Sequence, residues 1–200
     1  MAFVNATFPN PGLIHGIEKT LARPTTIVGN SAIESRLQKL QHYRSRWNWP
    51  SRGMEVSKRD TVFNFVTDTM GFSKNSVKFK DPLGSKWNNT ALAYGGSSNL
   101  FKLTVRGGTD NHPVFHIDAD VTVTVDGSPA GFTKSIVNGV PYLAVTGATG
   151  ASVVRVSGTF YYAVRLDQAT VEYTNEYLTL GNLDAGGIVG DISLIEVFEY

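Results

Sequence analysis

Four side chains that can bind metal ions lie close together in the sequence: His112, His116, Asp118 and Asp120. The last three alternate along the chain, so in an extended strand they would share one face at intervals of about 6.6–7 Å. Imidazole nitrogen and carboxylate oxygen can together bind a divalent cation. At that spacing a second strand would have to complete the site. A solvated polar face is therefore the favoured interpretation, and a metal site at His116, Asp118 and Asp120 is the alternative.

Sequence signatures of catalysis are absent from the chain. It contains neither a G-x-S-x-G nucleophile motif nor a G-x-x-x-x-G-K-[ST] phosphate loop. No motif marks a pair of carboxylates for glycoside hydrolysis among the 17 acidic residues. The segment from Arg106 to Asp110 could bind an anion, but its two glycines favour a plain tight turn. The sequence therefore predicts a protein that is not an enzyme and carries no cofactor.

Aromatic side chains make up 11% of the chain. If exposed, they could form a platform for sugar rings; if buried, they would fill the core or a subunit interface, where Tyr and Trp are favoured. The residues concerned are Tyr161, Tyr162, Tyr173, Tyr177, Trp47, Trp49 and Trp87. The core and interface interpretation is favoured, and a carbohydrate- or receptor-binding β domain is kept as the alternative function.

The composition limits the classes of protein to which the chain can belong. Its 200 residues suffice for one large domain or a domain with an insertion. The net charge of +1 gives no electrostatic case for binding nucleic acid or an anionic membrane. The absence of cysteine excludes disulfides and thiolate chemistry. No apolar run approaches the ~18 residues of a membrane span, and the N-terminus lacks the features of a secretory signal.

Short strands are predicted along most of the chain. Its 20 glycines and its low fraction of charged residues, 18%, favour a turn-rich β protein. Residues 152–200 are rich in β-branched and aromatic types, and the other elements are expected to be organised around them. Residues 115–125 alternate strictly between apolar and polar, which predicts one half-exposed antiparallel strand. The pair Asn138-Gly139 between two such runs predicts a β-hairpin with a type I′ turn.

One helix is predicted, over residues 57–70. Ser57 is placed to be its N-cap, with Asp60 three residues later as the acidic variant of a capping box. Gly71 is placed to end the helix, because glycine tolerates the left-handed conformation found there. One face carries an apolar stripe that would pack on the core. The stripe consists of Val62, Phe63, Phe65, Val66 and Met70.

The first 49 residues give no single periodic pattern. Residues 1–30 are predicted to form an extended arm, because proline and glycine interrupt them often. Its apolar side chains must lie either on the arm's own domain or on a neighbouring subunit; they include Phe3, Phe8, Leu13 and Ile14. Residues 31–49 fit either a helix or a strand. In a strand, Arg36, Arg44 and Arg46 would share a basic face opposite Trp47, and that face would be solvated or, alternatively, bind nucleic acid.

These segments together predict a mainly β fold. The expected architecture is a β-sandwich or split barrel with one packed helix. Residues 31–93 and 151–200 would form the β core with its helix. Residues 94–150 would form a β insertion, which could also be continuous with the core.

Several of the predicted elements together resemble a known family. They are Asp60, Phe63, Phe65 and Gly71 in the helix, then Phe79-Lys80-Asp81, Val121 to Gly127, Gly158 to Asp167, and Ile192 to Glu196. In this order they resemble the distal tail, or tail-tip hub, proteins of long-tailed bacteriophages and gene transfer agents. Members of that family are about as long as this chain. The resemblance covers the chain from its middle to its end.

The resemblance implies a structural role in the virion. It implies a fold related to tail-tube proteins and a hexameric ring at the tail tip, assembled in the host cytoplasm. Such a ring joins the tail tube protein to the hub or fibre proteins, and DNA passes through its lumen without sequence-specific binding. No membrane insertion is expected. The candidate assembly residues are the apolar residues of the arm and the basic set: Phe3, Phe8, Leu13, Ile14, Arg36, Arg44 and Arg46.

Overall fold

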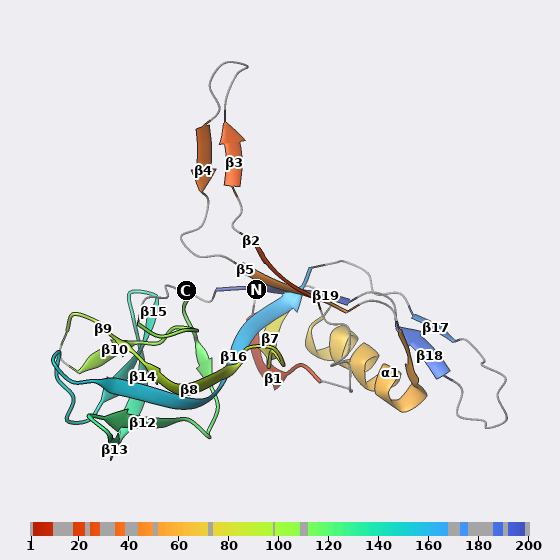
Figure 1. Cartoon of the computed structure of the whole chain (residues 1–200). Helices are drawn as coiled ribbons and strands as arrows, with labels where there is room; N and C mark the ends of the chain where they lie inside the picture. Colours follow the sequence, from red (N-terminus) through yellow and green to blue (C-terminus); the bar gives the residue numbers. More distant parts are fainter. Residues whose placement is uncertain are drawn as a thin grey trace. The chain divides into compact units, whose positions relative to one another are not determined.

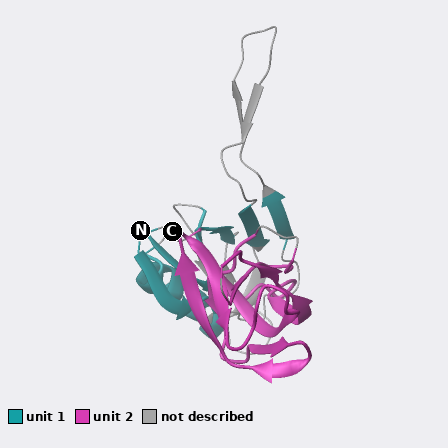
Figure 2. Ribbon diagram, turned by 90° about the vertical axis from the view of Figure 1, so that its left-hand side faces the viewer, with its two compact units in different colours: residues 1–78, 164–197 teal, residues 79–163, 198–200 magenta. Residues whose placement is uncertain are grey.

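The computed structural model shows a mainly β protein with one helix, as the sequence predicts (Figure 1). The chain divides into two compact units, residues 1–78 with 164–197 and residues 79–163 with 198–200 (Figure 2). The residues that the structure describes are 2–9, 18–22, 25–28, 35–38, 44–49, 52–71, 74–97, 99–108, 112–167, 173–175, 186–189 and 192–198.

The first unit is built on a mixed sheet. Its strand order is β1-β7-β16-β19-β5-β2. These strands are β1 (Ala2–Thr7), β7 (Asn75–Phe79), β16 (Val154–Leu166), β19 (Ile192–Glu196), β5 (Arg44–Trp49) and β2 (Glu18–Ala22). The pair β1–β7 is parallel, whereas β19 runs antiparallel to both β16 and β5. Two short strands of the expected N-terminal arm, β1 and β2, therefore belong to the sheet of their own unit.

Two smaller sheets accompany this one. Strands β17 (Tyr173–Asn175), β18 (Gly186–Val189) and β6 (Arg52–Glu55) form an antiparallel three-stranded sheet. Strands β3 (Thr25–Val28) and β4 (Ser35–Gln38) pair with each other as an antiparallel ribbon. The described parts of residues 31–49 are thus strands, β4 and β5, and not a helix.

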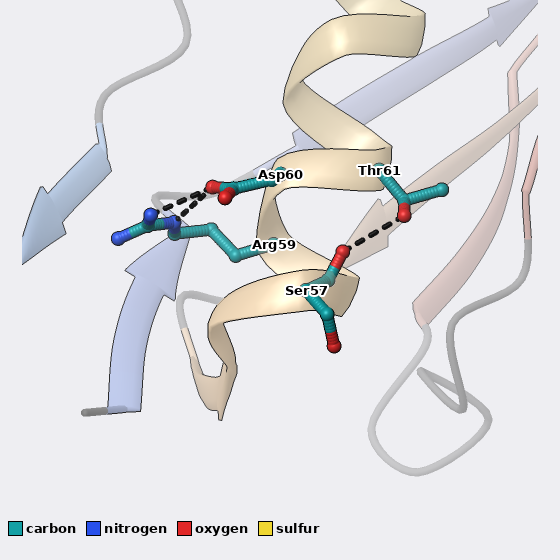
Figure 3. A network of polar contacts seen from close by, with 4 residues as sticks. All are labelled: Ser57, Arg59, Asp60 and Thr61. Atoms are coloured by element: carbon teal, nitrogen blue, oxygen red, sulfur yellow. Dashed lines mark hydrogen bonds and ion pairs between the residues drawn. The ribbon is translucent and has the colours of Figure 1, made fainter. Parts of the chain in front are cut away.

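The helix lies close to its predicted position but begins one residue earlier. Helix α1 spans Val56–Asn64 and continues as a π-helical segment, Phe65–Thr69. Ser57 therefore lies inside the first turn, and its prediction as the N-cap is wrong. Its carbonyl oxygen accepts a hydrogen bond from Thr61 Oγ1 at 2.8 Å, and Asp60 pairs with Arg59 rather than closing a capping box (Figure 3).

The apolar stripe predicted for the helix is confirmed at three of its five positions. Val62, Val66 and Met70 are completely buried. They recur every four residues, a spacing longer than the α-helical turn and shorter than the π-helical one, so a helix that changes from α to π keeps them aligned. Gly71 then ends the helix with φ at +51°, as predicted.

The second unit is built around the N-terminal part of β16. Strands β8 (Lys86–Ala91), β11 (His116–Ile117) and β12 (Thr122–Val125) all pair with it, and β13 (Ser128–Ala130) pairs with β12. A separate sheet has the order β14-β15-β10-β9, with β14 (Phe132–Val137), β15 (Val140–Val145), β10 (Leu100–Lys102) and β9 (Ala93–Tyr94). The expected insertion, 94–150, lies within this unit.

Two hairpins of this unit have the pair of positive φ values that a type I′ turn requires. Asn138 and Gly139 have φ values of 50° and 76°, and they join β14 to β15. The pair Asp126-Gly127, with φ values of 50° and 87°, joins β12 to β13 in the same way. The turn predicted at Asn138-Gly139 is confirmed, because only residues that tolerate positive φ can fill such a turn.

The prediction of one strand over residues 115–125 is wrong. The segment forms β11 and β12 separated by a turn, in which Val121 N donates to Asp118 O. Opposite the turn, β16 has a bulge: its register with β8 shifts between Val156 and Gly158. Gly158 has φ at +133°, and a Cβ there would lie 2.6 Å from Val121 Cα. Phe115, Val121 and Val123 are buried, as the alternating pattern predicts, but Ala119 in the turn is exposed.

Candidate functional site

The predicted metal-binding residues lie around this turn, where their carboxylates bind the protein itself. Asp118 accepts a 2.6 Å hydrogen bond from the Tyr161 hydroxyl and one of 2.8 Å from Ala119 N. Asp120 accepts two bonds of 2.8 Å from Thr159, one from its backbone N–H and one from its hydroxyl. Both carboxylates therefore hold the turn against β16.

The turn also removes the geometry on which the metal hypothesis depended. His116, Asp118 and Asp120 do not share one face of a strand, because β11 ends at Ile117. His116 lies opposite Tyr161 in the register of β11 with β16. Within the described ranges, no three His, Cys, Asp or Glu side chains are grouped so that they could hold a metal ion. The arrangement is suited to fixing the backbone.

The hydrogen bond between Tyr161 and Asp118 has a measurable consequence. That bond, with burial and the negative charges of Asp118 and Asp120, raises the pKa of Tyr161 from 10.0 to about 12. Since this folded-state pKa exceeds the unfolded one, the stabilisation is complete below pH 10 and is lost as the pH rises through 12.

We expect Asp118→Asn to lower the Tyr161 pKa towards 10, because the variant removes the charge and weakens the acceptor. The measurement is a spectrophotometric titration of tyrosinate at alkaline pH, with Tyr161→Phe to identify the signal. Asp126→Asn, a change at another carboxylate that bonds the backbone, is the control. An unchanged tyrosinate titration in Asp118→Asn would contradict this assignment.

His112, the fourth candidate ligand, lies in the core of the second unit. Only 1% of it is exposed, and its ring packs edge-on against Tyr162 and Phe198, with centroid distances of 6.0 Å and 5.6 Å. Its neighbours are those of a packed core residue rather than those of a solvent-facing ligand.

The aromatic residues proposed for a sugar platform lie largely inside the protein. Trp47, Trp87 and Tyr162 are buried, and Tyr161 is half-buried beside Asp118. Trp87 donates its Nε1–H to the carbonyls of Thr104 and Val105, at 2.9 Å and 3.1 Å. The side chains of the other three, Trp49, Tyr173 and Tyr177, lie outside the described residues. The described members of the set form no common exposed surface.

The apolar assembly candidates are only partly described. Phe8 is buried, and its ring contacts Phe65 edge-on at a centroid distance of 5.7 Å. Phe3, in β1, is half-buried. Leu13 and Ile14 lie outside the described residues. Of the described pair, Phe3 is therefore the more accessible, and Phe8 packs in its own unit.

The basic assembly candidates Arg44 and Arg46 lie on one face of β5, as their spacing predicts. Ser45 and Trp47, between and beyond them, are buried on the opposite face. Arg46 is half-exposed and forms an ion pair with Asp167. The side chain of Arg36, in β4, lies outside the described residues. One face of this part of the sheet is thus basic, and the other belongs to the core.

The buried face of β5 is held by a long-range polar contact. Glu196 in β19 is 2% exposed, and its carboxylate accepts a 2.9 Å hydrogen bond from Ser45 N. On the same face, the Lys19 ammonium of β2 lies 5.2 Å from the centre of the Trp47 ring. These contacts fix the strand that carries the two arginines.

The structure reveals an exposed apolar surface that the sequence did not mark. Ile136, Val137 and Val140 flank the turn of the β14–β15 hairpin and are 53%, 40% and 38% exposed. We call these three residues the apolar tip. The sequence predicted the hairpin, but the exposure of its end depends on how the described elements pack around it, which no local pattern signals.

Comparison with known proteins does not identify this arrangement. No protein-family model matches the chain, and no curated protein matches it. Among the described residues, no helix has the length and apolar character needed to cross a membrane.

Proposed function

We propose that this chain is a structural component of the tail tip of a long-tailed bacteriophage. In this proposal it forms a homo-oligomeric, hexameric ring between the tail tube and the distal hub or fibre proteins. DNA passes through the ring, and the chain performs no catalysis. The resemblance of its sequence segments supplies the family, and the arrangement of those segments supports it.

The observation that carries the proposal is the position of these segments in the fold. Val121 to Gly127 includes β12, Gly158 to Asp167 includes most of β16, and Ile192 to Glu196 is β19. Both β12 and β19 pair with β16. These three segments, which carry much of the resemblance, therefore form one hydrogen-bonded framework, as expected of features that specify a shared fold.

Three carboxylates described above also fit a structural role: Glu196, which is buried, and Asp118 and Asp120, which hold the turn against β16. Asp118, Asp120 and Glu196 all accept hydrogen bonds from the chain itself. A catalytic acid or base would instead face a space that a substrate can enter.

Electron microscopy of the purified full chain tests the proposal directly. We expect closed rings with a central opening, because a head-to-tail contact with cyclic symmetry generates them. A monodisperse monomer at high concentration that also fails to form rings with the tail tube protein would contradict it. Binding to a glycan array by such a monomer would favour the carbohydrate-binding alternative.

Reversing the charges of Arg44 and Arg46 tests the basic face of β5. We expect the variant carrying Arg44→Glu and Arg46→Glu to fold but to lower the yield of infectious particles by about tenfold or more. In the proposed ring, this basic face meets a negatively charged neighbour or the DNA path. The new carboxylates would therefore face like charges, which costs several kcal/mol. Lys86→Glu, a reversal at an exposed residue of β8, is the control. Normal particle assembly by the double variant would exclude this face from the interface.

A further inference from the structure

Among the described strands, β14 forms an edge of its sheet with a partner on one side. It is the end strand of the order β14-β15-β10-β9, and β15 is its partner among the described strands. Its six residues pair in continuous register, from Phe132 with Val145 to Val137 with Val140. Edge strands are usually protected by proline, by a bulge or by charge. Strand β14 has no proline, its register has no irregularity, and its single charged residue is Lys134.

The geometry of the hairpin determines which backbone groups face this edge. In a two-residue hairpin the residues flanking the turn, here Val137 and Val140, exchange hydrogen bonds. Backbone groups alternate in direction along a strand, so those of Phe132, Lys134 and Ile136 point away from β15. The bond from Thr146 N to Gly131 O, at 2.8 Å, agrees with this alternation. This edge thus presents the N–H and C=O groups of three residues.

The lysine that would protect the edge is held by its own chain. Lys134 Nζ donates a 2.7 Å hydrogen bond to the carbonyl oxygen of Phe115. Its neighbours on the same face of the strand are Phe132, which is half-buried, and Ile136, which is 53% exposed. An approaching strand would therefore meet backbone groups and apolar side chains.

The sequence of β14 is self-complementary about Lys134. Reading outward in both directions, the chain has a hydroxyl residue and then an apolar one: Thr133 and Phe132 on one side, Ser135 and Ile136 on the other. We propose that β14 pairs antiparallel with β14 of a second copy of this chain, about a two-fold axis through Lys134. Phe132 of each copy then lies opposite Ile136 of the other, and Thr133 lies opposite Ser135.

This pairing satisfies the backbone groups of β14 that face away from β15. The three outward-facing residues of each copy can form about six backbone hydrogen bonds between the copies. Aromatic pairs with β-branched residues and Thr–Ser pairs are both favourable across strands. The two lysines meet at the axis, which is unfavourable for like charges. Their ammonium groups are drawn towards the two Phe115 carbonyls, which reduces that cost.

The proposed contact differs from the one that a ring requires. A two-fold contact uses the same patch on both copies and closes after two, whereas a ring needs two different patches. The inference therefore does not depend on the proposed ring. Rings without this contact, or this contact without rings, are distinguishable results.

Disulfide cross-linking tests the pairing, because the chain contains no cysteine. In Lys134→Cys the two new thiols lie on the axis, with Cα atoms about 5.5 Å apart, within the range that a disulfide spans. We expect mild oxidation of the full chain to give a covalent dimer on non-reducing gels. Val137→Cys, on the same strand, is the matched control, because its two thiols would be too far apart. Failure of Lys134→Cys to link, or equal linking by Val137→Cys, would overturn the proposal.

A second pair of variants removes the need for an engineered bond. Ile136→Lys places a charge opposite Phe132 of the other copy, whereas Val137→Lys places one on the opposite face, facing Gly131. We expect Ile136→Lys to raise the dissociation constant of the dimer by about tenfold or more, and Val137→Lys to change it little. Sedimentation velocity over a concentration series measures both, and circular dichroism confirms folding. Equal effects of the two variants would overturn the proposal.

Discussion

Gly158→Ala is expected to lower the free energy of unfolding by about 3 kcal/mol, from backbone strain and overlap together. Gly158 has φ at +133°, a conformation that residues with a side chain rarely adopt. The new Cβ would also lie 2.6 Å from Val121 Cα and 3.0 Å from Asp120 O, both of which are backbone atoms. The turn at Asp118–Val121 would have to move away from β16, against the two bonds between Asp120 and Thr159.

The matched control for this variant is Gly147→Ala. Gly147 also has positive φ, +76°, but a Cβ there would meet no heavy atom within 4 Å. It should therefore cost only the conformational part, about 1–2 kcal/mol. Urea denaturation of both variants measures the difference. If the two alanines were equally destabilising, the close approach at Gly158 would have no energetic weight.

Trp87→Ala is expected to destabilise the protein by about 4 kcal/mol. Trp87 is 2% exposed, and its ring lies 4.6 Å from that of Phe160, centroid to centroid. Its Nε1–H donates to two carbonyl oxygens, those of Thr104 and Val105. Alanine would leave a large cavity and would remove the donor from buried acceptors.

Trp87→Phe separates these two contributions. Phenylalanine keeps a ring against Phe160 but cannot donate a hydrogen bond, so we expect a loss of about 1–3 kcal/mol. Thermal and urea unfolding, followed by far-UV circular dichroism, would give both values. A loss as large as that of alanine would mean that the indole hydrogen bonds, and not the packing, hold this part of the core.

The parts of the fold that local chemistry determines could be predicted from the sequence. Asn138-Gly139 and Asp126-Gly127 specify type I′ turns because few other residues accept two positive φ values. Gly71 ends the helix for a similar reason. The alternation of Arg44 and Arg46 with Trp47 gave the basic and buried faces of β5, since a strand has a side-chain period of two.

The parts that depend on distant residues could not be predicted. The break at Asp118–Val121 depends on Gly158 and Thr159, which lie far along the chain and bring no local signal to residues 115–125. In the folded chain the candidate metal ligands Asp118 and Asp120 accept hydrogen bonds from Tyr161 and Thr159 of β16. The burial of Trp47 and Trp87 depends likewise on which strands cover them.

The hydrogen bond between Ser45 and Glu196 joins residues that are 151 positions apart. Strand β5 lies between β2 and β19, so one of its edges stays empty until residues 192–196 have been synthesised. Most of the second unit, residues 79–163, is synthesised before that point. During translation the second unit can therefore begin to fold while β5 still lacks its partner β19 and Trp47 is uncovered. The rate at which the first unit forms is then set by translation and by the slow search that such distant pairing requires.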